Sequence, residues 1–91
     1  MRFTDLQVST MIQIATTVRS RRRTRHTVLL DGRRVATVTA TINDAGTVML
    51  DGRGLRDAAE ALHRTCWRPY ADSVSRVYDA VLSADRRARV S

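Results

Sequence analysis

Residues 27–42 read Thr-Val-Leu-Leu-Asp-Gly-Arg-Arg-Val-Ala-Thr-Val-Thr-Ala-Thr-Ile, and this stretch decides the fold. Asp31-Gly32 separates two runs of β-forming residues, and Gly tolerates the positive φ of a two-residue hairpin turn. From residue 34 to residue 42 the side chains alternate with the period of a strand. The expected core-facing set is Ala36, Val38, Ala40 and Ile42, and the expected outward set is Val35, Thr37, Thr39 and Thr41. The stretch therefore predicts a β-hairpin.

A third strand is expected after this hairpin. Residues 43–46 carry the turn signal Asn-Asp-Ala-Gly, and residues 47–50 have strand character. The first and third strands of a meander run in the same direction, so their Asp-Gly-Arg corners would lie at one end of the sheet. Four basic residues would then cluster there: Arg33, Arg34, Arg53 and Arg56. The simpler interpretation, which we prefer, is that Asp-Gly suits the end of any strand.

Two structures fit the N-terminal segment. Thr4 and Gln7 have the spacing of a capping box, which favours a helix. Helical spacing is also shown by Val8, Met11, Ile12, Ala15 and Val18. The same stretch alternates β-branched residues from Val8 to Val18, which is typical of a strand. We predict a helix because its start signal is specific, and the strand stays open as the alternative.

The C-terminal part has two apolar stripes at helical spacing, separated by Pro69. Proline lacks the amide hydrogen that a helix interior needs, so a helix break is expected near Pro69. The second stripe is long for so small a sheet, and we expect it to form a homodimer interface. The residues expected at this interface are Tyr70, Val74, Val77, Tyr78 and Val81.

Length allows one domain, because 91 residues are room for one core and no more. We therefore predict one small basic domain over residues 1–91, of the α+β class. Its elements would be an N-terminal helix, a three-stranded antiparallel meander and two C-terminal helices. Cys66 is the only cysteine, and no stretch has the roughly 20 apolar residues of a membrane span, so we expect a cytoplasmic protein without a membrane partner.

Positive charge is concentrated in one part of the chain. The formal net charge is +7, and all 16 basic residues are Arg. Codon usage in a G+C-rich genome explains part of this composition. It does not explain why seven Arg against one Asp give residues 19–34 a charge of +6. Residues 19–26 are predicted to form an Arg-rich loop or arm, and such a concentrated charge attracts polyanions.

Arginine suits phosphate because its planar fork donates two hydrogen bonds and keeps its charge. The sequence therefore predicts a nucleic-acid-binding protein of low sequence specificity, of a nucleoid-associated or regulatory type. DNA is favoured over RNA. Only four aromatic residues are present, which argues against a base-stacking platform. The expected phosphate contacts are Arg19, Arg21, Arg22, Arg23, Arg25, Arg33, Arg34 and Arg53.

Enzyme and metal sites are not predicted. His63 and Cys66 share a helix face, but the sequence supplies no third group to orient them, so a structural cysteine is the simpler interpretation. One Cys and two His cannot complete the usual zinc site. Gly52-Arg53-Gly54 could present amides to a phosphate, but the full phosphate-loop patterns are absent and a strand-to-helix turn is preferred. No cofactor is expected.

The alternative function is protein interaction. The small size and Arg-only composition would also suit an accessory protein of a bacteriophage or of a G+C-rich bacterium. Such a module would bind and inhibit a host protein through an exposed helix or sheet face. The apolar stripe after Pro69 and the shortage of stacking aromatics favour this alternative.

The predicted element order over about residues 4–66 resembles that of the double-stranded RNA-binding domain. Two features depart from that family. Only Arg53 and Arg56 stand near the start of the second helix, where the family carries a basic cluster. Asp31-Gly32 replaces the family's Gly-Pro-x-His loop. The resemblance also requires a helix at the N-terminus, so membership is not assigned.

Overall fold

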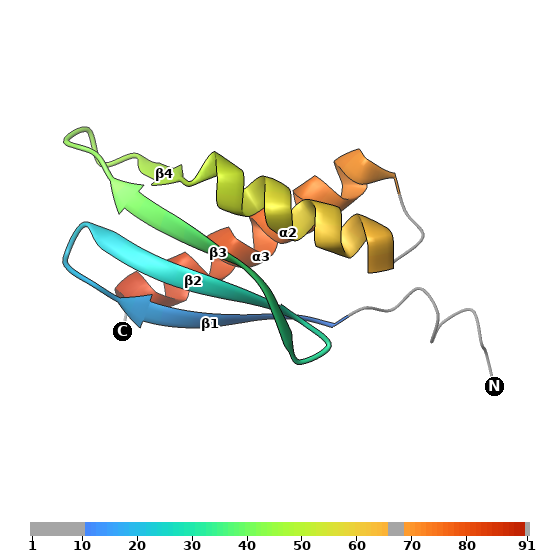
Figure 1. Ribbon diagram of the computed structural model, residues 1–91. Coiled ribbons are helices and arrows are strands. Elements are labelled where there is room, and N and C mark those ends of the chain that lie inside the picture. Colours follow the sequence, from blue (N-terminus) through green and yellow to red (C-terminus); the bar gives the residue numbers. More distant parts are fainter. Residues whose placement is uncertain (1–10, 66–68, 91) are drawn as a thin grey trace.

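The computed structural model describes residues 11–65 and 69–90, and it is an α+β structure as predicted (Figure 1). Its elements are β1 (Ile12–Val18), β2 (Arg23–Leu30), β3 (Arg33–Ile42), β4 (Val48–Leu50), α2 (Gly52–Thr65) and α3 (Tyr70–Val90). The four strands form one antiparallel sheet in chain order. Neither of these two helices is long and apolar enough to cross a membrane.

The central hairpin is the one that the sequence predicts. Asp31 and Gly32 have φ values of 50° and 85°, so both turn residues occupy the left-handed region. This is the geometry of the two-residue turn whose twist matches that of the flanking strands. Asp31 also fixes the neighbouring strand, because its carboxylate accepts a hydrogen bond from the Met11 amide at 2.9 Å.

The predicted N-terminal helix is wrong for the residues that the structure describes. Residues 12–18 form β1 and pair with β2 over their whole length, from Ile12 opposite Leu30 to Val18 opposite Thr24. This pairing buries part of Ile12 and Ile14 against the core, and such long-range packing outweighs a local capping signal. The capping residues Thr4 and Gln7 lie outside the described residues. Because a strand precedes the meander, the resemblance to the double-stranded RNA-binding domain fails.

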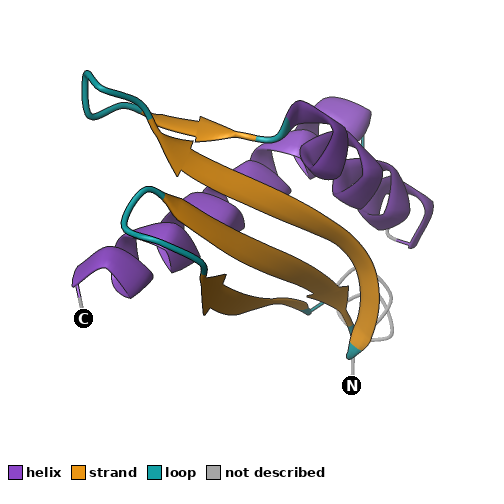
Figure 2. Cartoon of the chain, turned by 60° about the vertical axis from the view of Figure 1, so that its left-hand side comes forward, coloured by secondary structure: helices purple, strands orange, loops and turns teal. Residues whose placement is uncertain are grey.

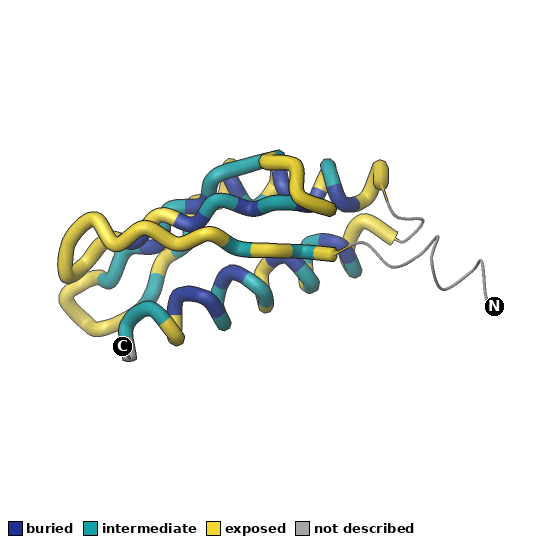
Figure 3. Tube along the Cα trace, turned by 90° about the horizontal axis from the view of Figure 1, so that it is seen from below, coloured by how far each residue is buried: buried dark blue, intermediate teal, exposed yellow. Residues whose placement is uncertain are grey.

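One face of the sheet packs on the helices, and Figure 2 shows α3 crossing that face. α2 packs along β3 and α3, whereas α3 also contacts β1 and β2. The buried stretches of strands and helices face one another in Figure 3. The buried residues that form one hydrophobic cluster are Val28, Leu30, Val38, Ala58, Leu62, Val77 and Val81. The expected inward position of Val38 and Ala40 is confirmed, since both are fully buried.

Val35 was expected to face outward, but it packs against the core. The pairing of β2 with β3 shifts between Val28 and Leu29, so that Val28 stands opposite Ala36 and Leu29 opposite Arg34. Val35 is thus the extra residue of a β-bulge, which interrupts the simple alternation.

The apolar stripe of α3 is largely used inside the single chain. Val77 and Val81 are fully buried in the core, where we expected them at a dimer interface. Val74 is half-buried, and only Tyr70 and Tyr78 are exposed, at 39% and 43%. The stripe is therefore not a continuous free surface, because two antiparallel helices on one small sheet need these residues to close the core.

Candidate nucleic-acid interface

Neither helix of the described residues packs on the second face of the sheet, and we call it the open face. On β2 the buried residues Thr24 and His26 alternate with the exposed residues Arg23 and Arg25. Since successive side chains of a strand point to opposite sides, Arg23 and Arg25 lie on the open face. The strand register extends this face to Gln13, Ala15, Thr17, Thr27, Leu29, Arg34, Thr37, Thr39, Thr41 and Met49.

The open face is positively charged and contains no acidic residue among these described positions. Arg25 lies between Thr17 and Thr39 in the register, and Arg23 lies opposite Thr41. Arg34 stands opposite Leu29 at the other end of the strands. Hydroxyl groups therefore surround the guanidinium groups, and both groups can donate hydrogen bonds to phosphate oxygens.

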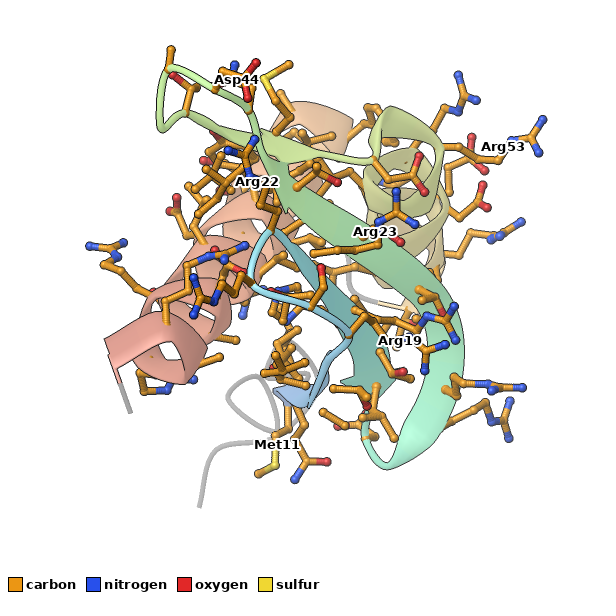
Figure 4. All side chains as sticks on the ribbon, turned by 90° about the vertical axis from the view of Figure 1, so that its left-hand side faces the viewer. Met11, Arg19, Arg22, Arg23, Asp44 and Arg53 are labelled. Carbon is orange, nitrogen blue, oxygen red and sulfur yellow. The ribbon has the colours of Figure 1, made fainter. Side chains whose placement is uncertain are left out.

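The predicted Arg-rich loop or arm is shorter than residues 19–26. Arg23 and Arg25 belong to β2, and only residues 19–22 connect β1 to it. The connection is a tight turn, because the amides of Arg19 and Ser20 both donate to the Arg23 carbonyl at 3.0 Å. Figure 4 shows Arg19 and Arg23 on the same side of the sheet, away from α3. The backbone thus holds Arg19 beside the open face.

Arg22 turns to a different partner. One of its guanidinium nitrogens, Nη1, lies 2.6 Å from Oδ1 of Asp44, in the turn between β3 and β4. Both side chains are exposed, at 62% and 97%. This exposed ion pair joins two turns at one end of the sheet (Figure 4) and places a negative charge beside Arg22.

Arg33 and Arg53 are not brought onto the open face. Arg33 stands opposite the buried Leu30, on the helix side, and shares a pocket of about 420 Å³ with Arg64 of α2. Asp51 comes just before α2, and its amide donates to the Thr39 carbonyl at 2.9 Å. Thr39 is six residues along β3 from Arg33, which is roughly 20 Å at the usual rise of a strand. The two Asp-Gly-Arg corners therefore do not form one cluster.

The Gly52-Arg53-Gly54 segment has a structural role. The Asp51 carboxylate accepts a hydrogen bond from the Arg53 amide at 3.2 Å, so it caps the start of α2 and adds negative charge there. Gly54 lies against β3, and a Cβ at this position would overlap the backbone carbonyl of Thr37. The segment thus allows α2 to approach the sheet closely, as the strand-to-helix interpretation expects.

A buried polar network, which the sequence did not predict, supports the β1–β2 turn from the helix side. The Asp85 carboxylate lies 3.1 Å from Nε2 of His26 and accepts a hydrogen bond from Nε of Arg89 at 2.7 Å. Nη1 of Arg89 then donates to the Arg21 carbonyl at 3.2 Å. The network ties α3 to β2 and to the turn that carries Arg19 and Arg22. The alternation of His26 with buried apolar residues was the one sequence signal for it.

Opposing effects act on the pKa of Asp85. Burial raises the pKa of the carboxyl group, but hydrogen bonds from Arg89 and His26 and the positive charge of the Arg89 guanidinium outweigh burial. The pKa therefore lies below its ordinary value, and Asp85 is ionised at neutral pH. An ionised Asp85 only accepts, so Nε2 of His26 carries the hydrogen that it donates.

The network has the group order of a catalytic triad, because Nδ1 of His26 lies 2.9 Å from the Thr16 hydroxyl. His26 is fully buried, however, and its second nitrogen is already bonded to Asp85. A general base must lie within reach of a bound substrate to exchange protons with it. A substrate cannot reach this imidazole, because the His26 side chain is not exposed to solvent. The arrangement therefore acts as a structural link between β1, β2 and α3.

The structure describes only one residue of the His63–Cys66 pair. His63 contacts the Tyr70 ring edge-on, with ring centroids 5.9 Å apart. Cys66, its proposed partner, lies outside the described residues. Within residues 11–65 and 69–90 no group of three or more His, Cys, Asp or Glu side chains could hold a metal ion.

Comparison of the chain with protein-family models, with curated proteins and with solved structures found no match. The function is therefore inferred from the geometry of the open face.

Proposed function

We propose that this protein binds nucleic acid through phosphate contacts made by the open face, with little sequence specificity. One observation carries the proposal. Arg23, Arg25 and Arg34 lie on the open face, Arg19 lies beside them, and the described positions of that face include no acid. A patch with this charge raises the local concentration of a polyanion and lowers the cost of docking it.

The rigidity of the face supports this function. Arg23 and Arg25 project from a central strand that is paired on both sides, by β1 and by β3. Arg19 is held by the turn, and the turn is held by Arg89. Because the backbone positions are fixed before binding, less entropy is lost when the guanidinium groups contact phosphate.

The chemistry of the face favours backbone contacts over reading of bases. The face presents Arg and Thr side chains, and its described positions carry no aromatic ring on which a base could stack. Contacts from Arg and hydroxyl groups to phosphate fix position without reading sequence. We therefore propose duplex DNA as the ligand, since a single strand would depend on stacking.

The proposal is tested by mobility-shift titration of the wild type against duplex DNA, single-stranded DNA and duplex RNA. The informative variant is Arg23→Ala/Arg25→Ala, which removes two charges from the open face. The matched control is Arg56→Ala/Arg86→Ala, which removes two charges from exposed positions of α2 and α3. We expect duplex DNA binding that the first variant weakens at least tenfold and the control changes little. Equal affinity of the two variants contradicts the proposal.

The second candidate is a module that binds and inhibits a host protein. The exposed rings of Tyr70 and Tyr78 on α3 favour it. The burial of Val77 and Val81 counts against it, because the apolar surface that such a partner would cover is interrupted. Salt-insensitive capture of one protein by the wild type, lost in Tyr78→Ala, would favour this candidate.

A further inference from the structure

The outer edge of β1 is an edge of the sheet that the structure describes. β1 is the first strand of the sheet, so one of its sides pairs with β2 and no described strand pairs with the other. The Met11 carbonyl accepts from the Asp31 amide, and the Arg19 amide donates to the Arg23 carbonyl. Odd-numbered residues therefore direct their backbone groups toward β2. The even-numbered residues Ile12, Ile14, Thr16 and Val18 direct theirs outward.

This edge lacks the features that usually prevent strands from pairing. Natural edge strands carry charged residues, proline or a bulge. β1 has the sequence Ile-Gln-Ile-Ala-Thr-Thr-Val, with no charge and no proline, and its register with β2 is unbroken. Val18 is 63% exposed at its end. The seven residues of this edge carry no charge, although the net charge of the chain is +7.

β1 is complementary to itself. If two copies pair antiparallel about Ala15, Ile12 stands opposite Val18 of the second copy, and Ile14 stands opposite Thr16. Each residue whose backbone groups point away from β2 then stands opposite a residue of the same kind in the second copy. This is the condition for an unbroken antiparallel ladder of hydrogen bonds. The cross-strand pairs are β-branched on one face, and two small Ala side chains meet at the centre. No charged residue of β1 faces a like charge, because β1 carries none.

The geometry points to a homodimer in which β1 pairs with β1 of a second copy, joining two four-stranded sheets into one of eight strands. A twofold axis through Ala15 uses the same edge of both copies, so the assembly closes at two chains. The other edge of the sheet is less suited to pairing. β4 has only three residues, and α2 stands against the β3 backbone where Gly54 meets Thr37.

The pairing preserves the two faces of the sheet. The side chains of the even-numbered residues of β1 lie on the helix side of the sheet, and in this pairing they stand opposite even-numbered residues of the second copy. The helices of both copies therefore lie on one side of the joined sheet, and both open faces lie on the other. A shallow pocket of about 250 Å³ beside the seam is lined by Ile14, Thr16, Ala84, Arg87 and Ala88. The small residues of α3 in this pocket leave room for side chains of the second copy. The dimer would present a basic face twice as long as that of one chain.

The test is the molecular mass in solution, measured by sedimentation without nucleic acid, so that its outcome does not depend on the proposed function. We expect the wild type to reach twice the 10.2 kDa of one chain and to dissociate on dilution. Ala15→Glu and Ala15→Lys each place like charges opposite each other at the centre of the seam. We expect each variant alone to dimerise at least tenfold more weakly, and an equimolar mixture of the two to recover dimers.

The matched controls are Met49→Glu and Met49→Lys, which change an exposed residue of the open face at the opposite edge. We expect both controls to dimerise like the wild type, and circular dichroism to show that the Ala15 variants are folded. The mixing experiment remains decisive if one Ala15 variant alone is poorly folded. If the wild type has the mass of one chain at all concentrations, the inference is overturned. It is also overturned if the Ala15 variants dimerise like the wild type.

Discussion

The imidazole of His26 and the carboxylate of Asp85 lie 3.1 Å apart, although 59 residues of chain separate them. The contact joins β2 to the last turns of α3, and both side chains are buried. Arg89 completes the carboxylate's hydrogen bonds from one helical turn away. With the hydrogen bond from Arg89 to the Arg21 carbonyl, this fixes the C-terminal end of α3 against the turn between β1 and β2.

Asp85→Asn should destabilise the protein. The amide cannot balance the charge of Arg89, and it leaves a buried network with a missing partner. Removing one partner of a buried ion pair lowers the free energy of unfolding by about 3 kcal/mol or more. We expect the lower end of this range, because the Arg89 side chain is 21% exposed. Urea unfolding at neutral pH measures the free-energy change, and Asp79→Asn, at an exposed position of the same helix, is the control. Equal stability of the two variants would contradict a role for the network.

The same carboxylate predicts a pH dependence. The pKa of Asp85 is lower in the folded protein than its ordinary value of 3.8. Its contribution to stability is therefore complete above this ordinary value and is lost as the pH falls through the folded value. We expect the stability difference between wild type and Asp85→Asn to shrink as the pH is lowered from about 6 to about 2. A difference that stays constant over this range would show that ionisation of Asp85 does not contribute.

The local elements of this fold could be predicted from local signals. Asp31-Gly32 predicts the hairpin because the positive φ of the turn depends on these two residues alone. The alternation around Val38 predicts a strand without any knowledge of the strands that pair with it. Residues 12–18 gave no such answer. Their helical and alternating patterns coexist, and pairing with β2 decides between them.

The candidate site was predictable only in part, for the same reason. The charge of residues 19–34 was evident, but the direction of each side chain depends on the register. Arg23 and Arg25 alternate onto the open face, whereas Arg33 turns to the helix side opposite Leu30. The stripe of α3 could not reveal that Val77 and Val81 close the chain's own core. The alternation of His26 with buried residues indicates that His26 lies inside, but it does not indicate that its partner is Asp85, 59 residues away.

Gly54→Ala should be destabilising although alanine favours helices. A Cβ at Gly54 would overlap the Thr37 carbonyl, and a backbone atom cannot rotate away. Overpacking of this kind costs about 1–3 kcal/mol. Gly52→Ala is the matched control, because a Cβ there meets no atom within 4 Å. Thermal unfolding of both variants checks the prediction, and a stabilised Gly54→Ala would show that α2 does not lie so close to β3.

Val81→Ala distinguishes a core residue from an interface residue. Removing two buried methyl groups should lower the free energy of unfolding by about 2 kcal/mol. The measurement is best made in the Ala15→Glu background, where we expect a monomer. If Val81 is a core residue, Val81→Ala lowers the free energy of unfolding by the same amount in that monomer. Tyr78→Ala, at a position 43% exposed, should lower it less. If the effect of Val81→Ala vanished in the monomer, the residue would belong to an interface after all.

Asp44→Asn should strengthen binding to DNA while leaving stability nearly unchanged. The ion pair of Arg22 with Asp44 is exposed, and such pairs contribute at most about 1 kcal/mol to folding. Removing the negative charge frees Arg22 for a phosphate beside the open face. Titration by fluorescence anisotropy should show a higher affinity than that of the wild type. A lower affinity would indicate that the pair is needed to hold the turn in its binding shape.

The most direct test of the central claim is the salt dependence of DNA affinity. Each phosphate contact made by an arginine contributes about 0.9 to the slope of log affinity against log salt concentration. We predict that Arg23→Ala/Arg25→Ala lowers the magnitude of this slope by about 1.8, whereas Arg56→Ala/Arg86→Ala leaves it unchanged. If both variants keep the same slope as the wild type, the open face does not contact phosphate.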